Sequence, residues 1–152
     1  MEPPRQIEPR SLGDYLEVIS KAVFQSGMSW RVVEAKWPGF REAFHDFDPD
    51  RVAALTPDDV DRLAGDTRII RNRRKIEATI ANAEAILALD EDTTGGFEAW
   101  LASHGDFERT IDAMREHFRF LGDMGAYYVL YVVGQPVPDH ESAMARLEAR
   151  KR

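Results

Sequence analysis

The chain contains no cysteine among its 152 residues, and this absence excludes several kinds of site. Without thiols there is no disulfide framework, no thiolate-bound zinc and no cysteine nucleophile. Long hydrophobic runs are also missing, since none approaches the roughly 18 apolar residues that a membrane span requires. The first ten residues lack the apolar segment of a secretory signal. The sequence therefore predicts a cytoplasmic protein without membrane contacts.

Positive charge is scarce in the chain as a whole. The 20 Lys and Arg residues stand against 27 Asp and Glu, which gives a formal net charge of -7. This balance argues mildly against nucleic-acid binding, because cations supply most of the affinity for phosphate. The distribution matters more than the sum, however. A run of cations directly follows an aspartate-rich stretch and comprises Arg68, Arg71, Arg73, Arg74 and Lys75.

Signals for β-strands are few, and helical periodicity dominates the chain. Residues 127–133 are rich in tyrosine and valine, but they lack a partner strand, so we interpret them as a buried helix. The length suits one domain with one core. We predict an all-α, single-domain helical bundle of roughly seven to nine helices. Residues 1–10 form an extended, proline-rich arm in this prediction, and residues 11–152 form the helical domain.

Capping residues and helix breakers predict where the helices begin and end. Ser11 caps a first helix that stops at Gly27, and Ser29 caps a second helix that Pro38-Gly39 interrupts. Thr56-Pro57 opens a further helix, because it combines a capping hydroxyl with proline in the first turn. Other helices are expected at about 72–89, the longest, and at 97–102, 107–118 and after Asp139.

The segment Phe24-Gln25-Ser26-Gly27-Met28-Ser29-Trp30 places a large flat aromatic next to a glycine at the end of an apolar helix. An exposed tryptophan in such a place can stack a nucleic-acid base. Gln25 and Ser29 are candidates to line the same slot and to contact the edge of the base. The alternative is that Trp30 belongs to the core.

Residues 118–127 have the pattern of a helix-hairpin-helix. A helix ends in aromatics, Gly122 and Gly125 bracket a tight turn, and an apolar helix follows. Glycines let backbone N–H groups approach a phosphate, and a helix N-terminus favours an anion. An ordinary interhelical turn is the alternative, and the negative charge of Asp123 argues against phosphate binding.

Asp139 follows a rigid loop, residues 134–138, and precedes the last helix. A carboxylate at the mouth of a pocket can stabilise the positive charge that develops on a sugar as its glycosidic bond breaks. The alternative is that Asp139 only caps the helix that follows it.

Taken together, these segments resemble the 3-methyladenine DNA glycosylase I family. The likeness comprises Phe24 to Trp30, residues 44–49, 52–54 and 69–76, and the hairpin region 118–140 with its Asp-His pair. It covers about two thirds of the chain. The resemblance implies an all-α fold of the helix-hairpin-helix DNA glycosylase type. It also implies excision of an alkylated base that is flipped out of the duplex.

The resemblance assigns Trp30 as the stacking tryptophan, with Tyr127 or Tyr128 as a partner in the slot, although the tyrosines are also typical of core packing. The family's base-recognising glutamate falls at Ala22, and the family's N-terminal tyrosine and metal ligands are missing from the proline-rich arm. One zinc-ligand position matches His140, but its cysteine companion falls at Met144. We therefore expect no metal and no cofactor.

The sequence thus predicts a monofunctional DNA glycosylase of base-excision repair that removes an alkylated purine such as 3-methyladenine. Its catalytic residue is Asp139, and its partner is double-stranded DNA with a damaged base, bound by a monomer. No lysine lies in or beside the hairpin, so a Schiff-base lyase step is not expected. The predicted contacts to the DNA backbone are Gly122, Gly125, Arg71, Arg73, Arg74 and Lys75. The alternatives are a catalytically inactive DNA-binding module and a protein-interaction module.

Overall fold

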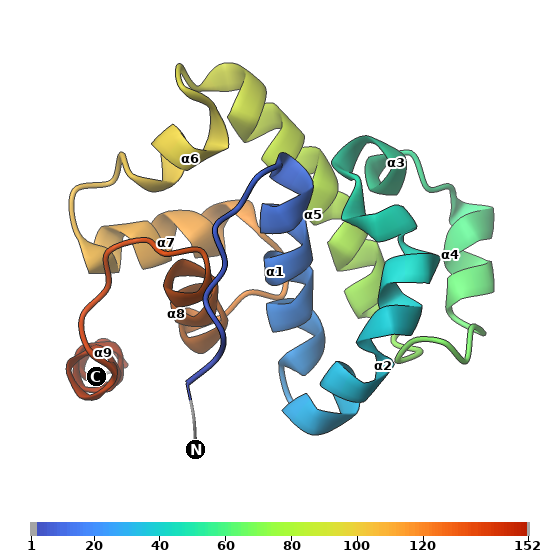
Figure 1. Ribbon diagram of the computed structural model, residues 1–152, viewed down its shortest axis with the longest axis horizontal. Helices are drawn as coiled ribbons and strands as arrows, with labels where there is room; N and C mark the ends of the chain where they lie inside the picture. Colours follow the sequence, from blue (N-terminus) through green and yellow to red (C-terminus); the bar gives the residue numbers. More distant parts are fainter. Residues whose placement is uncertain (1–2, 152) are drawn as a thin grey trace.

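The computed structural model describes residues 3–151, and all regular secondary structure within this range is helical (Figure 1). The all-α prediction is confirmed. No helix in the described part of the chain is long and apolar enough to span a bilayer. The elements in chain order are α1 (Leu12–Gln25), α2 (Trp30–Ala43), the 3-10 helix η1 (His45–Phe47), α3 (Pro49–Ala53), α4 (Pro57–Leu63), α5 (Arg73–Asp92), α6 (Gly96–Leu101), α7 (Phe107–His117), α8 (Asp123–Val132) and α9 (His140–Ala149).

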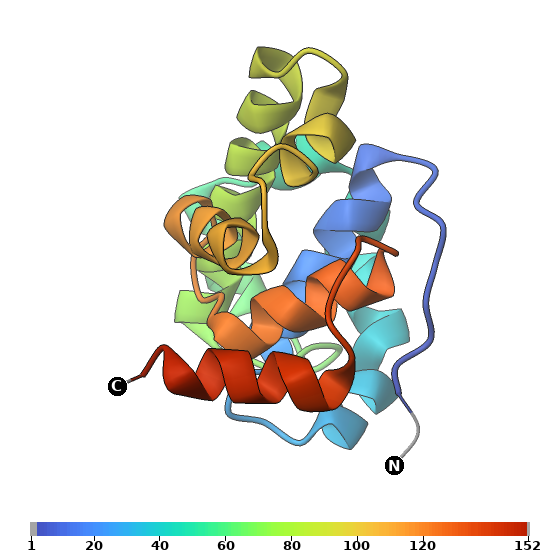
Figure 2. The same ribbon diagram turned by 90° about the vertical axis from the view of Figure 1, so that its left-hand side faces the viewer.

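Helices α1 and α5 form the centre of the molecule. The long helix α5 contacts α1, α3, α4 and α6, while α1 also packs against α8. Figure 1 shows α2, α3 and α4 on one side of this central pair and α6 to α9 on the other. Figures 1 and 2 show α9 at the edge of the molecule, and its Arg146 and its C-cap residue Arg150 pair with Glu108 and Asp112 of α7. The loop between α1 and α2 and the start of α5 therefore extend from the ends of these two central helices.

Aromatic side chains fill the core between α1 and α2. Trp37 stacks on Phe40 with ring centroids 4.7 Å apart and on Phe47 at 5.3 Å, and Phe24 meets Phe40 edge-on at 4.6 Å. Phe47 has no exposed surface, although its φ of 57° lies in the left-handed region. Burial of this large ring stabilises the strained turn that ends α2.

Helix α2 does not stop at Pro38-Gly39, so that prediction is wrong. The helix continues to Ala43 with Pro38 inside it. Gly39 is required for packing, because a Cβ atom there would lie 2.3 Å from the backbone oxygen of Arg68. The close approach of the 66–68 segment thus explains a glycine that the sequence alone presents as a helix breaker.

The predicted caps are confirmed at the starts of α1 and α4. Ser29 stands at the N-cap of α2, but its side chain makes no capping hydrogen bond, and α5 has a cap that was not predicted. The Ser11 hydroxyl accepts a hydrogen bond from the Asp14 backbone N–H, and Thr56 forms a reciprocal capping box with Asp59. The Asn72 side chain accepts from the backbone N–H of Lys75 at the start of α5. The stretch at 127–133 lies in α8 and at its C-cap, so its interpretation as a buried helix is also confirmed.

The arm preceding α1 lies against the end of α8. Residues 3–10 contain no helix. The backbone N–H of Ile7 donates to the Val132 oxygen at 2.8 Å, and Gln6 Nε2 donates to the Tyr131 oxygen at 3.0 Å. The arm thereby satisfies carbonyl groups that the last turn of α8 leaves without intrahelical partners.

Candidate nucleic-acid interface

The loop joining α1 to α2, residues 26–29, is hereafter called the slot loop. Gly27 within it has a φ of 72°, which favours glycine. Trp30 follows as the first residue of α2 and is 46% exposed, with the Arg31 guanidinium 5.8 Å from its ring centroid. Trp30 is therefore not a core residue. Gln25 is half-buried and Ser29 is exposed at the same end of α1 and α2.

The cations at the start of α5 divide into two groups. Arg71, Arg73 and Arg74 are exposed. Arg73 donates to Asp61 at 2.7 Å, which neutralises part of its charge. The Arg74 guanidinium lies 5.4 Å from the ring centroid of Phe120. These three side chains remain accessible to a phosphate backbone.

Lys75 is not on the surface, and its predicted contact with the DNA backbone needs correction. The side chain is only 4% exposed, and Nζ donates to the backbone oxygens of Phe24 at 3.1 Å and Ser26 at 2.5 Å. Burial lowers the pKa of the ammonium. Lys75 lies on the inner face of α5 with Ile76, and it binds the end of α1 instead of phosphate.

The connection between α7 and α8, residues 118–122, is hereafter called the hairpin. Phe118 and Leu121 are buried, whereas Phe120 is 39% exposed with a φ of 59°. Gly122 is the N-cap of α8, and no side chain caps this helix. The first N–H groups of α8 are therefore available to an anion. At Gly125, a Cβ atom would lie 3.0 Å from Leu121 Cδ1, so glycine there lets the hairpin fold back on α8.

Two polar residues around the hairpin, Arg115 and Asn82, were not identified from the sequence. Arg115 on α7 donates to Asp123 at 2.7 Å, so the acid in the turn is neutralised. Asn82 on α5 binds both backbone groups of Arg119: its Oδ1 accepts from the N–H at 2.7 Å, and its Nδ2 donates to the carbonyl at 3.1 Å. The only sequence signal for Asn82 was its position, because it is a polar residue within the longest predicted helix and close to the apolar positions of that helix.

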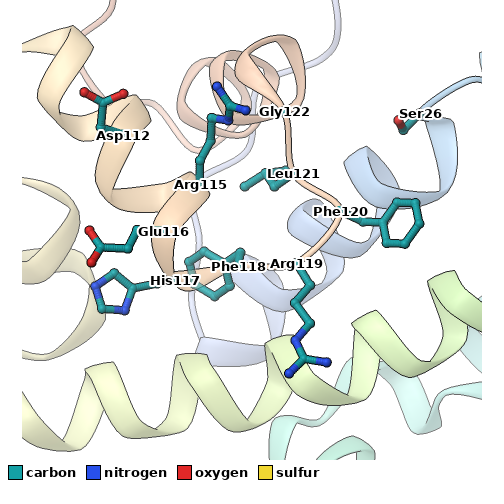
Figure 3. Close-up of a pocket in the computed structure, with 10 residues that line it drawn as sticks. All are labelled: Ser26, Asp112, Arg115, Glu116, His117, Phe118, Arg119, Phe120, Leu121 and Gly122. Atoms are coloured by element: carbon teal, nitrogen blue, oxygen red, sulfur yellow. The ribbon is translucent and has the colours of Figure 1, made fainter.

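The slot loop and the hairpin meet at an open cavity of about 810 Å³. In Figure 3 the Phe120 ring points toward the side where Ser26 lies, and Arg119 extends toward α5. The lining is mainly polar and charged, and it comprises Ser26, Asp112, Arg115, Glu116, His117, Phe118, Arg119, Phe120, Leu121 and Gly122. Two segments nearly a hundred residues apart thus share one surface.

The two predicted slot tyrosines point in different directions. Tyr127 is buried and meets Phe107 edge-on, with ring centroids 5.9 Å apart. Tyr128 is half-buried, and its pKa is raised to about 12 by burial and by the charges of Glu34 and Glu17. Consecutive residues of a helix diverge by about 100°. Only Tyr128 faces the side of α1 and α2, so the prediction that Tyr127 lines the slot is not supported.

Ala22 occupies a close contact between α1 and α8. It is 5% exposed, and a Cβ atom built on Gly125 would lie 3.6 Å from the Ala22 Cβ. The two helices are therefore in ordinary packing contact here, and the methyl group of Ala22 provides no carboxylate at this position.

Asp139 caps α9 with both of its carboxylate oxygens. Oδ1 accepts from the backbone N–H of Ser142 at 2.9 Å, and Oδ2 accepts from the Ser142 hydroxyl at 3.2 Å. These bonds lower the pKa of the exposed Asp139 carboxyl. Burial, then the charges of Tyr131 and Asp139, raise the pKa of Tyr127. The group is therefore ionised at neutral pH, as a charge-stabilising group must be.

His140 packs against the Tyr127 ring with centroids 6.3 Å apart. Within residues 3–151, no three His, Asp or Glu side chains come together in a way that could hold a metal ion.

Comparison with known proteins finds relatives whose similarity includes the slot loop and most of the hairpin. The sequence pattern of the methyladenine glycosylase family matches residues 13–121, which include α1 to α7 and most of the hairpin. The chain belongs to the methyladenine glycosylase family. Two curated relatives of the family carry the names of DNA-3-methyladenine glycosylases. The one from Escherichia coli (strain K12) is 47% identical over 68 residues, which are 45% of this chain and 36% of the relative.

The second relative, from Haemophilus influenzae, is 43% identical over 67 residues, covering 44% of this chain and 36% of the relative. The matched stretch thus spans about a third of the length of each of the two curated relatives. A solved structure described as 3-methyladenine DNA glycosylase I is 30% identical with a TM-score of 0.74, and the match covers 84% of this chain and 81% of that one.

A further structure, of 3-methyladenine DNA glycosylase I from Staphylococcus aureus, is described as the structural basis of 3-methyladenine recognition. It has a TM-score of 0.75 at 23% identity, covering 86% of this chain and 80% of that one. At this identity the likeness concerns the fold. The fold of the methyladenine glycosylase family therefore extends over most of the chain, including the slot loop, the start of α5 and the hairpin.

Proposed function

We propose that this protein is a monofunctional DNA glycosylase that removes an alkylated purine such as 3-methyladenine in base-excision repair. The observation that carries the proposal is the exposed Trp30 directly after the slot loop, within a chain whose family match spans residues 13–121. A monomer acting on double-stranded DNA in the cytoplasm is the simplest form of this function.

Contact with DNA begins at the exposed cations and at the hairpin. Arg71, Arg73 and Arg74 attract the phosphate backbone, and the uncapped N–H groups between Gly122 and Gly125 bind one phosphate. Arg115 compensates the charge of Asp123, which would otherwise repel that phosphate.

The damaged base leaves the stack and lies on Trp30, since an alkylated purine is cationic and an indole face is electron-rich. Tyr128, Gln25 and Ser29 are the neighbours that can complete the slot. Positive charge develops on the sugar as the glycosidic bond lengthens, and the ionised Asp139 stabilises it. The base departs with the bonding electron pair, which neutralises its positive charge, and water adds to the sugar carbon and releases one proton to the solvent.

The first experiment measures the release of free base from alkylated duplex DNA by the protein and by Trp30→Ala. Stacking on an aromatic is worth about 1–3 kcal/mol per base, so we expect release to fall roughly 10- to 100-fold. Because Trp30 is half-exposed, the variant should remain folded. Equal release by both proteins would exclude Trp30 from the slot.

Asp139→Asn tests the catalytic carboxylate in the same assay. Asparagine caps helices about as well as aspartate, so the fold should persist while release drops on the order of 100- to 1000-fold. Asp48→Asn is the matched control, because Asp48 is an exposed aspartate that caps α3 in the same way. Unchanged release by Asp139→Asn would remove this residue from the mechanism.

A DNA-binding module without catalysis is the second candidate, and the alanine at position 22 favours it. Ala22 is buried against Gly125 and supplies no carboxylate where the family resemblance expects the base-recognising glutamate. This candidate predicts salt-dependent DNA binding without base release. Absence of DNA binding even at low salt would leave only a protein-interaction role.

A further inference from the structure

Two buried polar side chains on α5 make long-range contacts. Lys75 is 4% exposed, and Asn82 is fully buried. They are seven residues apart, which is about two helical turns, so they project from the same face of α5. Their polar atoms point into the protein and do not contribute to the charged surface at the start of this helix.

Each of the two residues binds backbone groups of one DNA-facing segment. Lys75 donates to the carbonyls of Phe24 and Ser26, at the start of the slot loop. Asn82 donates to the carbonyl of Arg119 and accepts from its N–H, in the hairpin. The four contacts bridge 51, 49 and 37 residues of sequence.

Both segments need such a tether. The carbonyls at the end of α1 have no partners inside their own helix. In the hairpin, Phe120 follows Arg119 directly and has a left-handed φ of 59°, a conformation that persists only where the surroundings impose it. Ser26 and Phe120 line the same cavity, so a shift of either segment would alter their common surface.

We propose that Lys75 and Asn82 are positioning residues that hold the slot loop and the hairpin in register, so that both segments meet one DNA strand at the same time. This inference rests on the proposed function and adds to it the residues that preorganise the interface. Burial of polar groups costs free energy that apolar side chains would not. The gain lies in the fixed geometry of the two segments.

The test measures the affinity for duplex DNA that contains a tetrahydrofuran abasic-site analogue, over a series of salt concentrations. Asn82→Leu should bind about tenfold more weakly, as expected for the loss of one buried hydrogen-bonded contact. The slope of log affinity against log salt should not change, because no phosphate-binding cation is removed. Hydrogen exchange at the Arg119 amide should accelerate, while the α5 amides stay protected.

Thr79→Val is the matched control. Thr79 is also fully buried on α5, but its hydroxyl donates to the Lys75 carbonyl within the helix. It should retain DNA affinity and slow exchange at Arg119, and an equal loss of affinity in this variant would overturn the inference.

Lys75→Met should weaken binding as Asn82→Leu does, and the double variant should lose little more than either single change, because both tethers serve one register. If the losses of DNA affinity in the two single variants add fully in the double variant, the inference that both residues hold one register is wrong. If Lys75→Met does not fold, Asn82→Leu with its exchange measurement decides the matter.

The two proposals fail in different ways. Wild-type protein that binds DNA without releasing base contradicts the glycosylase function and leaves this inference standing if Asn82→Leu binds more weakly. Base release with equal affinities of wild type and Asn82→Leu contradicts the inference alone. Absence of DNA binding by the wild type contradicts both.

Discussion

Neighbouring residues in this protein have opposite environments. Arg74 is exposed over the Phe120 ring, while Lys75 is buried against the end of α1. Tyr127 is packed in the core against Phe107, while the next residue, Tyr128, faces Glu34 and Glu17. A helix turns about 100° per residue, so adjacent side chains reach different surroundings.

Tyr128 should make stability depend on alkaline pH. Burial, then the charges of Glu34 and Glu17, raise its pKa from 10.0 to about 12. The folded state therefore holds the phenolic proton more tightly than the unfolded state does. The resulting stabilisation is complete below pH 10 and is lost as the pH rises through about 12.

The measurement compares urea unfolding of wild type and Tyr128→Phe across this pH window. We expect the difference in unfolding free energy between them to change by up to about 2 kcal/mol from pH 8 to strongly alkaline pH. The comparison isolates Tyr128 from the other tyrosines. A difference that does not vary with pH would show that the phenol is solvated.

Among the elements, α2 shows how packing overrides a local signal. Pro38-Gly39 is typical of a break, yet the helix runs through it to Ala43. Proline removes one backbone donor. Trp37, which precedes Pro38, nevertheless stacks on Phe40 and Phe47, which follow it, and this packing stabilises the helix on both sides of the proline. The glycine admits the backbone of Arg68.

Gly39→Ala should destabilise the protein, although alanine favours helices by about 1 kcal/mol over glycine. The added Cβ would lie 2.3 Å from the Arg68 oxygen, so backbone must move. We expect a net loss of about 1–3 kcal/mol in urea unfolding. The control is Gly65→Ala, where the nearest atom is the Arg62 oxygen at 3.8 Å and the change should stay within about 0.5 kcal/mol. Equal effects of the two substitutions would contradict the close approach.

At the scale of the whole molecule, a net charge of -7 coexists with a local basic surface. Several cations are neutralised by nearby acids: Arg68 pairs with Asp66, and Arg146 pairs with Glu108. Arg71 and Arg74 remain exposed at and just before the start of α5, and Arg74 lies over the Phe120 ring of the hairpin. Binding to DNA therefore depends on where the charge lies and only weakly on its sum.

Salt dependence should identify these cations. Arg71→Gln and Arg74→Gln should each weaken DNA binding at low salt and reduce the slope of log affinity against log salt by about 1. Arg51→Gln is the control, since Arg51 is exposed on α3, beyond the far end of α2 from the slot loop. A slope that falls equally for Arg51→Gln would indicate nonspecific attraction in place of a defined surface.

Much of the fold followed from the sequence. Ser11 and Thr56 cap their helices as predicted, because a cap depends on side-chain and backbone groups three residues apart. The helical nature of residues 127–133 followed from the absence of a partner strand. The exposed Trp30 was expected from a family resemblance, because local pattern alone was also compatible with a core position.

Only the tertiary structure revealed which cations reach the surface and which polar groups lie inside. Lys75 and Asn82 bind backbone atoms 37 to 51 residues away, and no local pattern contains such distances. The continuation of α2 through Pro38 depends on the neighbouring segment at Arg68 for the same reason. Short-range hydrogen bonds and periodicity determine the helices, whereas the site arises where separate segments pack together.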